Sequence, residues 1–70
     1  MRRELQRRLD AAVAELDEDD REVILMRHGE QLSNQDVAAL LNLTEPAASM
    51  RHLRALRRLR ELLQPEASHE

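Results

Sequence analysis

The chain has 70 residues, enough for one small domain with a single hydrophobic core. It contains no cysteine and none of Phe, Tyr or Trp, which excludes disulfides, thiolate metal sites and the aromatic platforms on which single-stranded nucleic acid stacks. The net charge of -3 is distributed unevenly, because residues 44–63 carry five arginines against two acids whereas residues 1–43 carry six arginines against ten acids, so only one segment suits an anionic partner.

The first two predicted helices lie in the acidic part of the chain. Apolar residues recur at helical spacing up to Leu16, which predicts an amphipathic helix over residues 3–15. Acids at positions 17–20 favour the start of a second helix, because carboxylates oppose the positive end of the helix dipole. We expect this helix to include the consecutive apolar residues 23–26 and to end near Gly29 in a left-handed cap. Four apolar residues in a row cannot all face inward in so small a domain, so some apolar surface should stay open.

A short third helix is predicted after residue 32. Ser33 is followed three residues later by Asp36, which is the spacing of a capping box ahead of an apolar run. The helix should end at Asn42, because asparagine tolerates the left-handed conformation in which many helices end. Leu43 can then enter the core.

The fourth predicted helix is longer and basic. Thr44 is its expected cap, Pro46 belongs to its first turn, and the helical pattern continues to Leu63. A short helix, a three-residue turn and a longer basic helix together predict a helix-turn-helix motif, whose second helix enters the DNA major groove. The expected fold class is therefore all-α: a four-helix domain over residues 1–64 that contains a helix-turn-helix, lacks a wing and is followed by a disordered tail, residues 65–70.

One flank of the fourth helix carries an arginine stripe, Arg51, Arg54 and Arg58. Arginine matches the geometry of phosphate, so the stripe is predicted to hold a DNA backbone; the alternative is a solvated basic face on an ordinary bundle helix. His52 falls on the apolar face, where a neutral, buried or half-buried histidine with one hydrogen bond is expected rather than a pH switch. His28 is distant from it in sequence, and no metal-ligand spacing joins the two.

No residue pattern indicates catalysis. The serines Ser33, Ser49 and Ser68 lack a nucleophile elbow, and the acids at 17–20 lack the alternation and the glycine of a calcium loop. No apolar run reaches the roughly 18 residues of a membrane span, and the charged N-terminal residues do not resemble a signal peptide. We therefore expect a soluble cytoplasmic protein that is not an enzyme and has no cofactor, no metal and no membrane association.

The chain resembles region 4 of bacterial sigma factors of the extracytoplasmic-function type. The resemblance covers residues 16–63, which read LDEDDREVILMRHGEQLSNQDVAALLNLTEPAASMRHLRALRRLRELL, and residues 1–15 fit the helix that precedes this motif in the family. The concluding RALRRLRELL discriminates best, because the LSNQDVA segment alone is also similar to the LuxR-type domains of response regulators.

The resemblance implies a site for promoter DNA. In the family, this domain reads the upstream, minus-thirty-five promoter element with the N-terminal part of the fourth helix. Here that part offers apolar surface and one hydroxyl, so we expect thymine-methyl contacts and DNA shape to replace bidentate readout of guanine or adenine. The DNA-binding residues predicted in this way are Arg27, Ser33, Glu45, Pro46, Ala47, Ser49, Met50, Arg51, Arg54 and Arg58.

The resemblance also implies protein partners. In the family, the domain docks on the RNA polymerase core, with a helix at the tip of the beta-subunit flap lying in an apolar groove between the second and fourth helices. The residues predicted to line this groove are Val23, Ile24 and Met26. An anti-sigma factor is a further candidate partner, and self-association of the domain is a further candidate behaviour.

Two other functions remain open at the level of sequence. A LuxR-type DNA-binding domain would act as a dimer on paired half-sites. A helical protein-interaction or dimerisation module would use the apolar surface without DNA, which the acidic first half of the chain favours.

Overall fold

The computed structural model describes residues 2–64, which form a row of helices joined by short turns. The elements are α1, Arg2–Glu15; α2, Glu18–Ile24; a π-helix η1, Leu25–Gly29; α3, Asn34–Leu41; and α4, Glu45–Leu63. No strand, and therefore no wing, occurs within residues 2–64. The predicted all-α fold with four helices and a helix-turn-helix is confirmed. The expected tail, residues 65–70, lies outside the described residues, and the domain boundary at residue 64 stays a prediction.

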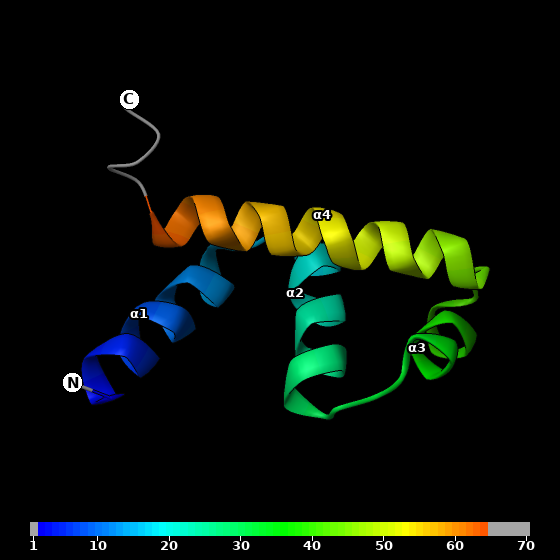
Figure 1. Cartoon of the computed structure of the whole chain (residues 1–70), viewed down its shortest axis with the longest axis horizontal. Coiled ribbons are helices and arrows are strands. Elements are labelled where there is room, and N and C mark those ends of the chain that lie inside the picture. The colour runs from blue at the N-terminus through cyan, green and yellow to red at the C-terminus, as the bar shows by residue number, and fades with distance from the viewer. Residues whose placement is uncertain (1, 65–70) are drawn as a thin grey trace.

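The helices are arranged around the longest one. Figure 1 shows α4 along the long axis of the molecule, with α1, α2 and α3 all on one side of it. The guanidinium of Arg21 donates to the carbonyl oxygens of Ala14 and Leu16, which fixes α2 to the end of α1. None of the helices in the described part of the chain combines the length and the hydrophobicity needed to cross a membrane.

Side-chain caps define where three of the helices begin. Asp17 accepts the N–H of Asp20 at 3.1 Å at the start of α2, and Ser33 accepts the N–H of Asp36 at 3.1 Å at the start of α3. Thr44 caps α4 in the same way, accepting the N–H of Ala47 at 3.2 Å. Each such cap stabilises the folded state by about 1 kcal/mol. The predicted caps Ser33 and Thr44 are thus confirmed.

The end of the second helix differs from the prediction. Gly29 does not adopt a left-handed conformation; the residue that does is Gln31, with φ 59°. The physical reason is the π-helix, which Glu30 N–H closes by donating to Leu25 O at 2.9 Å. Beyond the π-helix, Leu32 N–H donates to Met26 O at 2.8 Å. The wider turn holds one more residue than an α-turn. The chain therefore reverses after Gly29 instead of at it.

Two clusters of buried apolar side chains hold the helices together. Ala48 and Ala55 on α4 are completely buried, and their small size allows the neighbouring helices to approach α4 closely. Leu43 packs against the second cluster, as predicted. The first cluster joins α1, α2 and α4 through Ala12, Leu16, Ile24, Ala55 and Leu59. The second joins α3 to α4 through Val37, Ala38 and Ala48, with Met26, Leu32, Leu41 and Leu43 at its edge.

Candidate nucleic-acid interface

The turn between α3 and α4 has the geometry of a helix-turn-helix. Asn42 adopts the left-handed conformation, φ 59° and ψ 47°, as predicted. The N–H of Leu43 donates to Ala38 O at 2.8 Å, which closes the end of α3. Asn34 Nδ2 donates to the carbonyl oxygen of Glu45 at 3.1 Å and so joins the first residue of α3 to the first residue of α4. Sequence reasoning missed Asn34, because no local pattern distinguishes a residue that bridges two helices.

The predicted base-reading residues lie on the first two turns of α4. All five of them are exposed: Glu45, Pro46, Ala47, Ser49 and Met50. Half of the surface of Met50, 53%, is accessible, and Leu53 one turn further is 43% accessible. The start of α4 therefore presents apolar atoms and one hydroxyl outward, and contact of these residues with bases stays a prediction.

The arginine stripe is only partly free. Arg54 and Arg58 are exposed, whereas Arg51 is half-buried. Arg58 forms an exposed ion pair with Glu61 at 3.3 Å, a kind of pair that contributes little to stability and leaves the guanidinium accessible. Ser33, also predicted to bind DNA, is exposed, but its oxygen already accepts the N–H at the start of α3.

Carboxylates face two of these arginines. The first turn of α2 and the middle of α4 enclose a polar cavity of about 290 Å³. Burial raises the pKa of the Asp20 carboxyl, and the charges of the neighbouring aspartates and a hydrogen bond with Asp17 raise it further, while the Arg54 charge lowers it. The sequence did not predict this arrangement, because it depends on how α2 crosses α4. The cavity is lined by Asp17, Asp19, Asp20, Arg51 and Arg54.

Two histidines that are far apart in the sequence, His28 of η1 and His52 of α4, meet. His28 Nε2 and His52 Nε2 are 3.0 Å apart, and Arg27 Nη1 lies 3.4 Å from His52 Nδ1. Arginine can only donate, so His52 Nδ1 accepts, and the His52 ring proton sits on Nε2, from which it is donated to His28. Burial lowers the pKa of His52, and the charges of Arg27 and His28 lower it further.

This arrangement concerns two residues of the sequence analysis, and a phosphate contact of Arg27 stays a prediction. His52 is half-buried, as expected, but it has two polar partners instead of one. Arg27, predicted to hold a phosphate, lies half-buried against His52. No group of three residues that could ligate a metal occurs within residues 2–64.

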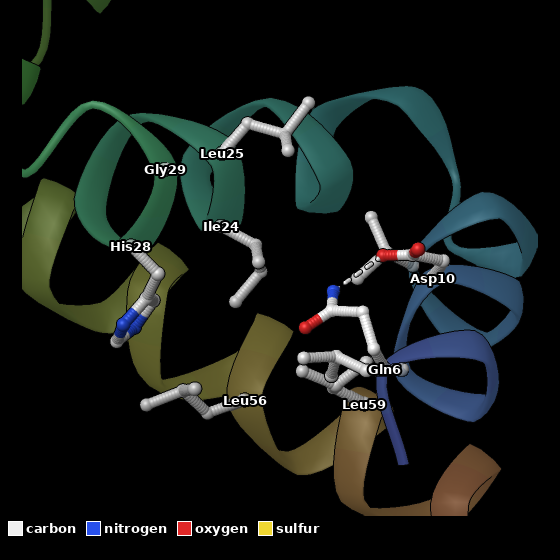
Figure 2. A pocket seen from close by; sticks show the side chains of 10 residues that line it. Gln6, Asp10, Ile24, Leu25, His28, Gly29, Leu56 and Leu59 are labelled. Atoms are coloured by element: carbon white, nitrogen blue, oxygen red, sulfur yellow. Dashed lines mark hydrogen bonds between the residues drawn. The ribbon is translucent and has the colours of Figure 1, made fainter. Parts of the chain in front are cut away.

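An apolar groove lies between α1, the α2–η1 segment and α4 (Figure 2). It has a volume of about 430 Å³. A hydrogen bond of 2.9 Å from Gln6 to Asp10 lies at its polar rim. Its lining residues are Gln6, Leu9, Asp10, Val13, Ile24, Leu25, His28, Gly29, Leu56 and Leu59.

The predicted groove residues are distributed between the groove and the core. Ile24 lines the groove with 5% of its surface accessible, whereas Val23 is completely buried in the core. Met26 packs against the second core cluster. The open apolar residue of this segment is Leu25, which lines the groove and is 49% accessible. Sequence reasoning missed it because four consecutive apolar residues do not by themselves show which one faces outward.

Comparison with known proteins agrees with the resemblance drawn from the sequence. Residues 6–59 match the family described as Sigma-70, region 4. The matched segment includes α2, α3, the turn between α3 and α4, and most of α4. No curated protein and no solved structure shows a significant match to the chain.

Proposed function

Because the chain belongs to the Sigma-70 region 4 family, whose domains bind promoter DNA as parts of sigma factors, we propose that it reads the upstream, minus-thirty-five promoter element with the start of α4. One observation carries this proposal. The left-handed turn at Asn42 and the hydrogen bond from Asn34 to Glu45 hold α3 against the start of α4 in a helix-turn-helix. The first two turns of its second helix expose Glu45, Pro46, Ala47, Ser49 and Met50.

The charge distribution supports a role for the same helix in holding the DNA backbone. Arg54 and Arg58 are exposed on one flank of α4, and Arg51 is half-buried beside them. In helix-turn-helix proteins, the reading residues enter the major groove while flanking side chains contact phosphates. Phosphate contacts fix the position of the domain, and apolar contacts and DNA shape would supply a modest preference for sequence.

Salt dependence of binding tests the DNA contact. If about four phosphates are neutralised, the affinity for a short duplex should fall roughly a hundredfold between about 50 and 200 mM salt. Arg54→Ala should weaken binding to promoter and scrambled duplexes alike. Arg3→Ala, which removes an exposed arginine from α1, is the matched control and should change affinity little. Fluorescence anisotropy measures the affinity of the wild type and both variants for the duplex. An affinity that does not change with salt concentration would refute the proposal.

The groove supports a second contact, with RNA polymerase. We propose that an apolar helix at the tip of the beta-subunit flap lies in the groove between α1, α2–η1 and α4. Helix-in-groove recognition depends on a few apolar anchors. Leu25 is the one exposed apolar side chain among the residues that line the groove. The family match favours this reading over a LuxR-type domain.

A peptide-binding experiment tests the groove. Leu25→Glu should abolish binding of a flap-tip helix peptide without unfolding the domain, because Leu25 is already 49% accessible. Leu40→Glu is the matched control, since Leu40 is 63% accessible and lies outside the groove. If the wild type does not bind the peptide but forms dimers that Leu25→Glu disrupts, the groove serves self-association instead.

A further inference from the structure

We propose that the acidic start of α2, defined here as Asp17, Asp19 and Asp20, weakens phosphate binding by Arg51 and Arg54, so that it limits the affinity of the domain for DNA. This inference rests on the proposed DNA binding through α4. It assigns to the acidic start of α2 an effect beyond helix capping.

The geometry places opposite charges around one space. The three carboxylates and the two guanidinium groups line the same polar cavity, about 290 Å³ in volume. Figure 1 shows the reason: α2 begins beside the middle of α4 and then leads away from it. A DNA phosphate that approaches Arg51 or Arg54 from this side therefore also approaches the carboxylates.

The arginines face these carboxylates without being bound by them. Within residues 2–64, the ion pairs are Arg7–Glu4 and Arg58–Glu61, so no carboxylate of the acidic start of α2 lies within 4.0 Å of Arg51 or Arg54. Burial and the neighbouring aspartates raise the pKa of Asp20, and the charge of Arg54 across the cavity opposes that rise. Neither guanidinium group is paired with one of these carboxylates, but the negative charges of the carboxylates lower the positive electrostatic potential around both arginines.

Helix capping accounts for only part of the acidic start. Asp17 caps α2 through its hydrogen bond to the N–H of Asp20. The carboxylates of Asp19 and Asp20 make no hydrogen bond within the described residues except the interaction of Asp20 with Asp17. Asp19 and Asp20 can therefore be neutralised without removing the cap.

The size of the effect follows from Coulomb's law. Two like charges about 8 Å apart in water repel each other enough to change a binding equilibrium about twofold. Two carboxylates that each act on one bound phosphate should together weaken DNA binding about fivefold at low salt. The difference should shrink at about 200 mM salt, because the screening length is then close to the separation of the charges.

The test compares two doubly neutralised proteins. Asp19→Asn/Asp20→Asn should bind a promoter duplex about fivefold more tightly than the wild type at about 25 mM salt. Glu18→Gln/Glu22→Gln changes the net charge equally on the same helix, but these residues lie on the side of α2 away from the cavity. This control should tighten binding less than about twofold. Circular dichroism verifies that both proteins are folded.

Each outcome has one meaning. Equal tightening in both double variants would reduce the effect to net charge and overturn the inference. Weaker binding by Asp19→Asn/Asp20→Asn would overturn it as well, because the acids would then position the arginines productively. If neither the wild type nor any variant binds DNA at low salt, the proposed function fails and the inference fails with it. Binding by Asp19→Asn/Asp20→Asn alone would support both.

A measurement without DNA tests the geometry separately. NMR titration should show that Arg54→Ala raises the pKa of Asp20, because the arginine charge that favours the carboxylate is removed. An unchanged pKa would mean that the two groups do not interact in solution. That result would overturn the inference and leave the proposed DNA binding intact.

Discussion

Single residues on the outer face of α4 determine what this domain can read in DNA. Met50 lies in the second turn of α4 and is 53% accessible. Its side chain is flexible and apolar, and its thioether sulfur is only a weak hydrogen-bond acceptor. In the major groove, the C5-methyl group of thymine is the apolar feature of a base pair. Sequence preference at this position should therefore depend on a methyl group.

Replacing thymine by deoxyuridine in the bound duplex tests this directly, because the exchange removes only the methyl group. Loss of one contacted methyl should weaken binding by the wild type about fourfold, the equivalent of about 0.8 kcal/mol. Met50→Ala should bind both duplexes equally, whereas Arg54→Ala should bind both more weakly and keep the difference between them. Anisotropy titrations of each of these proteins with each duplex give the affinities. A wild type that does not distinguish thymine from uracil would contradict a role for Met50 in base reading.

At the scale of the helical elements, the π-helix η1 determines how α2 ends. Gly29 lies within η1, has no positive φ, and would meet no neighbouring atom within 4 Å if it carried a Cβ. The left-handed residue is Gln31, a type with a side chain that such a conformation disfavours. The one glycine of the sequence, Gly29, therefore lies two residues before Gln31, the position at this helix end whose left-handed backbone favours glycine.

Two substitutions at this helix end should consequently stabilise the domain. Gly29→Ala should raise the free energy of unfolding by about 0.5 to 1 kcal/mol, because alanine loses less backbone entropy in a helical conformation. Gln31→Gly should also stabilise, by a similar or smaller amount, because it relieves the left-handed conformation. Urea unfolding monitored by circular dichroism gives both values. Destabilisation by Gly29→Ala together with no gain from Gln31→Gly would show that the helix ends at Gly29 after all.

At the scale of the whole molecule, local features were predictable and contacts between helices were not. Ser33, Asn42 and Thr44 could be assigned as helix ends because capping involves residues at most a few positions apart. The meeting of His28 with His52, and of the acidic start of α2 with the arginines of α4, depends on the angle at which α2 crosses α4. That angle is set by the packing of small and large side chains in two clusters, which periodicity alone does not specify. The helix-turn-helix was therefore predictable, while the surroundings of its arginines were not.

His52 links the stability of the whole domain to pH. The folded protein lowers the pKa of His52 below its ordinary value of 6.5, with burial as the main cause. The unfolded chain then binds a proton at His52 at a higher pH than the folded protein does, so stability rises with pH through this range. The contribution of His52 is fully present above about pH 6.5 and decreases as the pH falls below that value.

Urea unfolding at about pH 7.5 and about pH 5.5 tests this link. The wild type should be less stable at the lower pH, because a proton on His52 Nδ1 would remove the site that accepts from Arg27 and add a second positive charge 3.4 Å from the guanidinium. His52→Leu should show a smaller difference between the two pH values, since leucine suits a half-buried position on this face and does not titrate. A His52→Leu protein with the full pH dependence of the wild type would show that the proton is taken up at another residue. The contact between Arg27 and His52 would then have no part in the acid sensitivity of the fold.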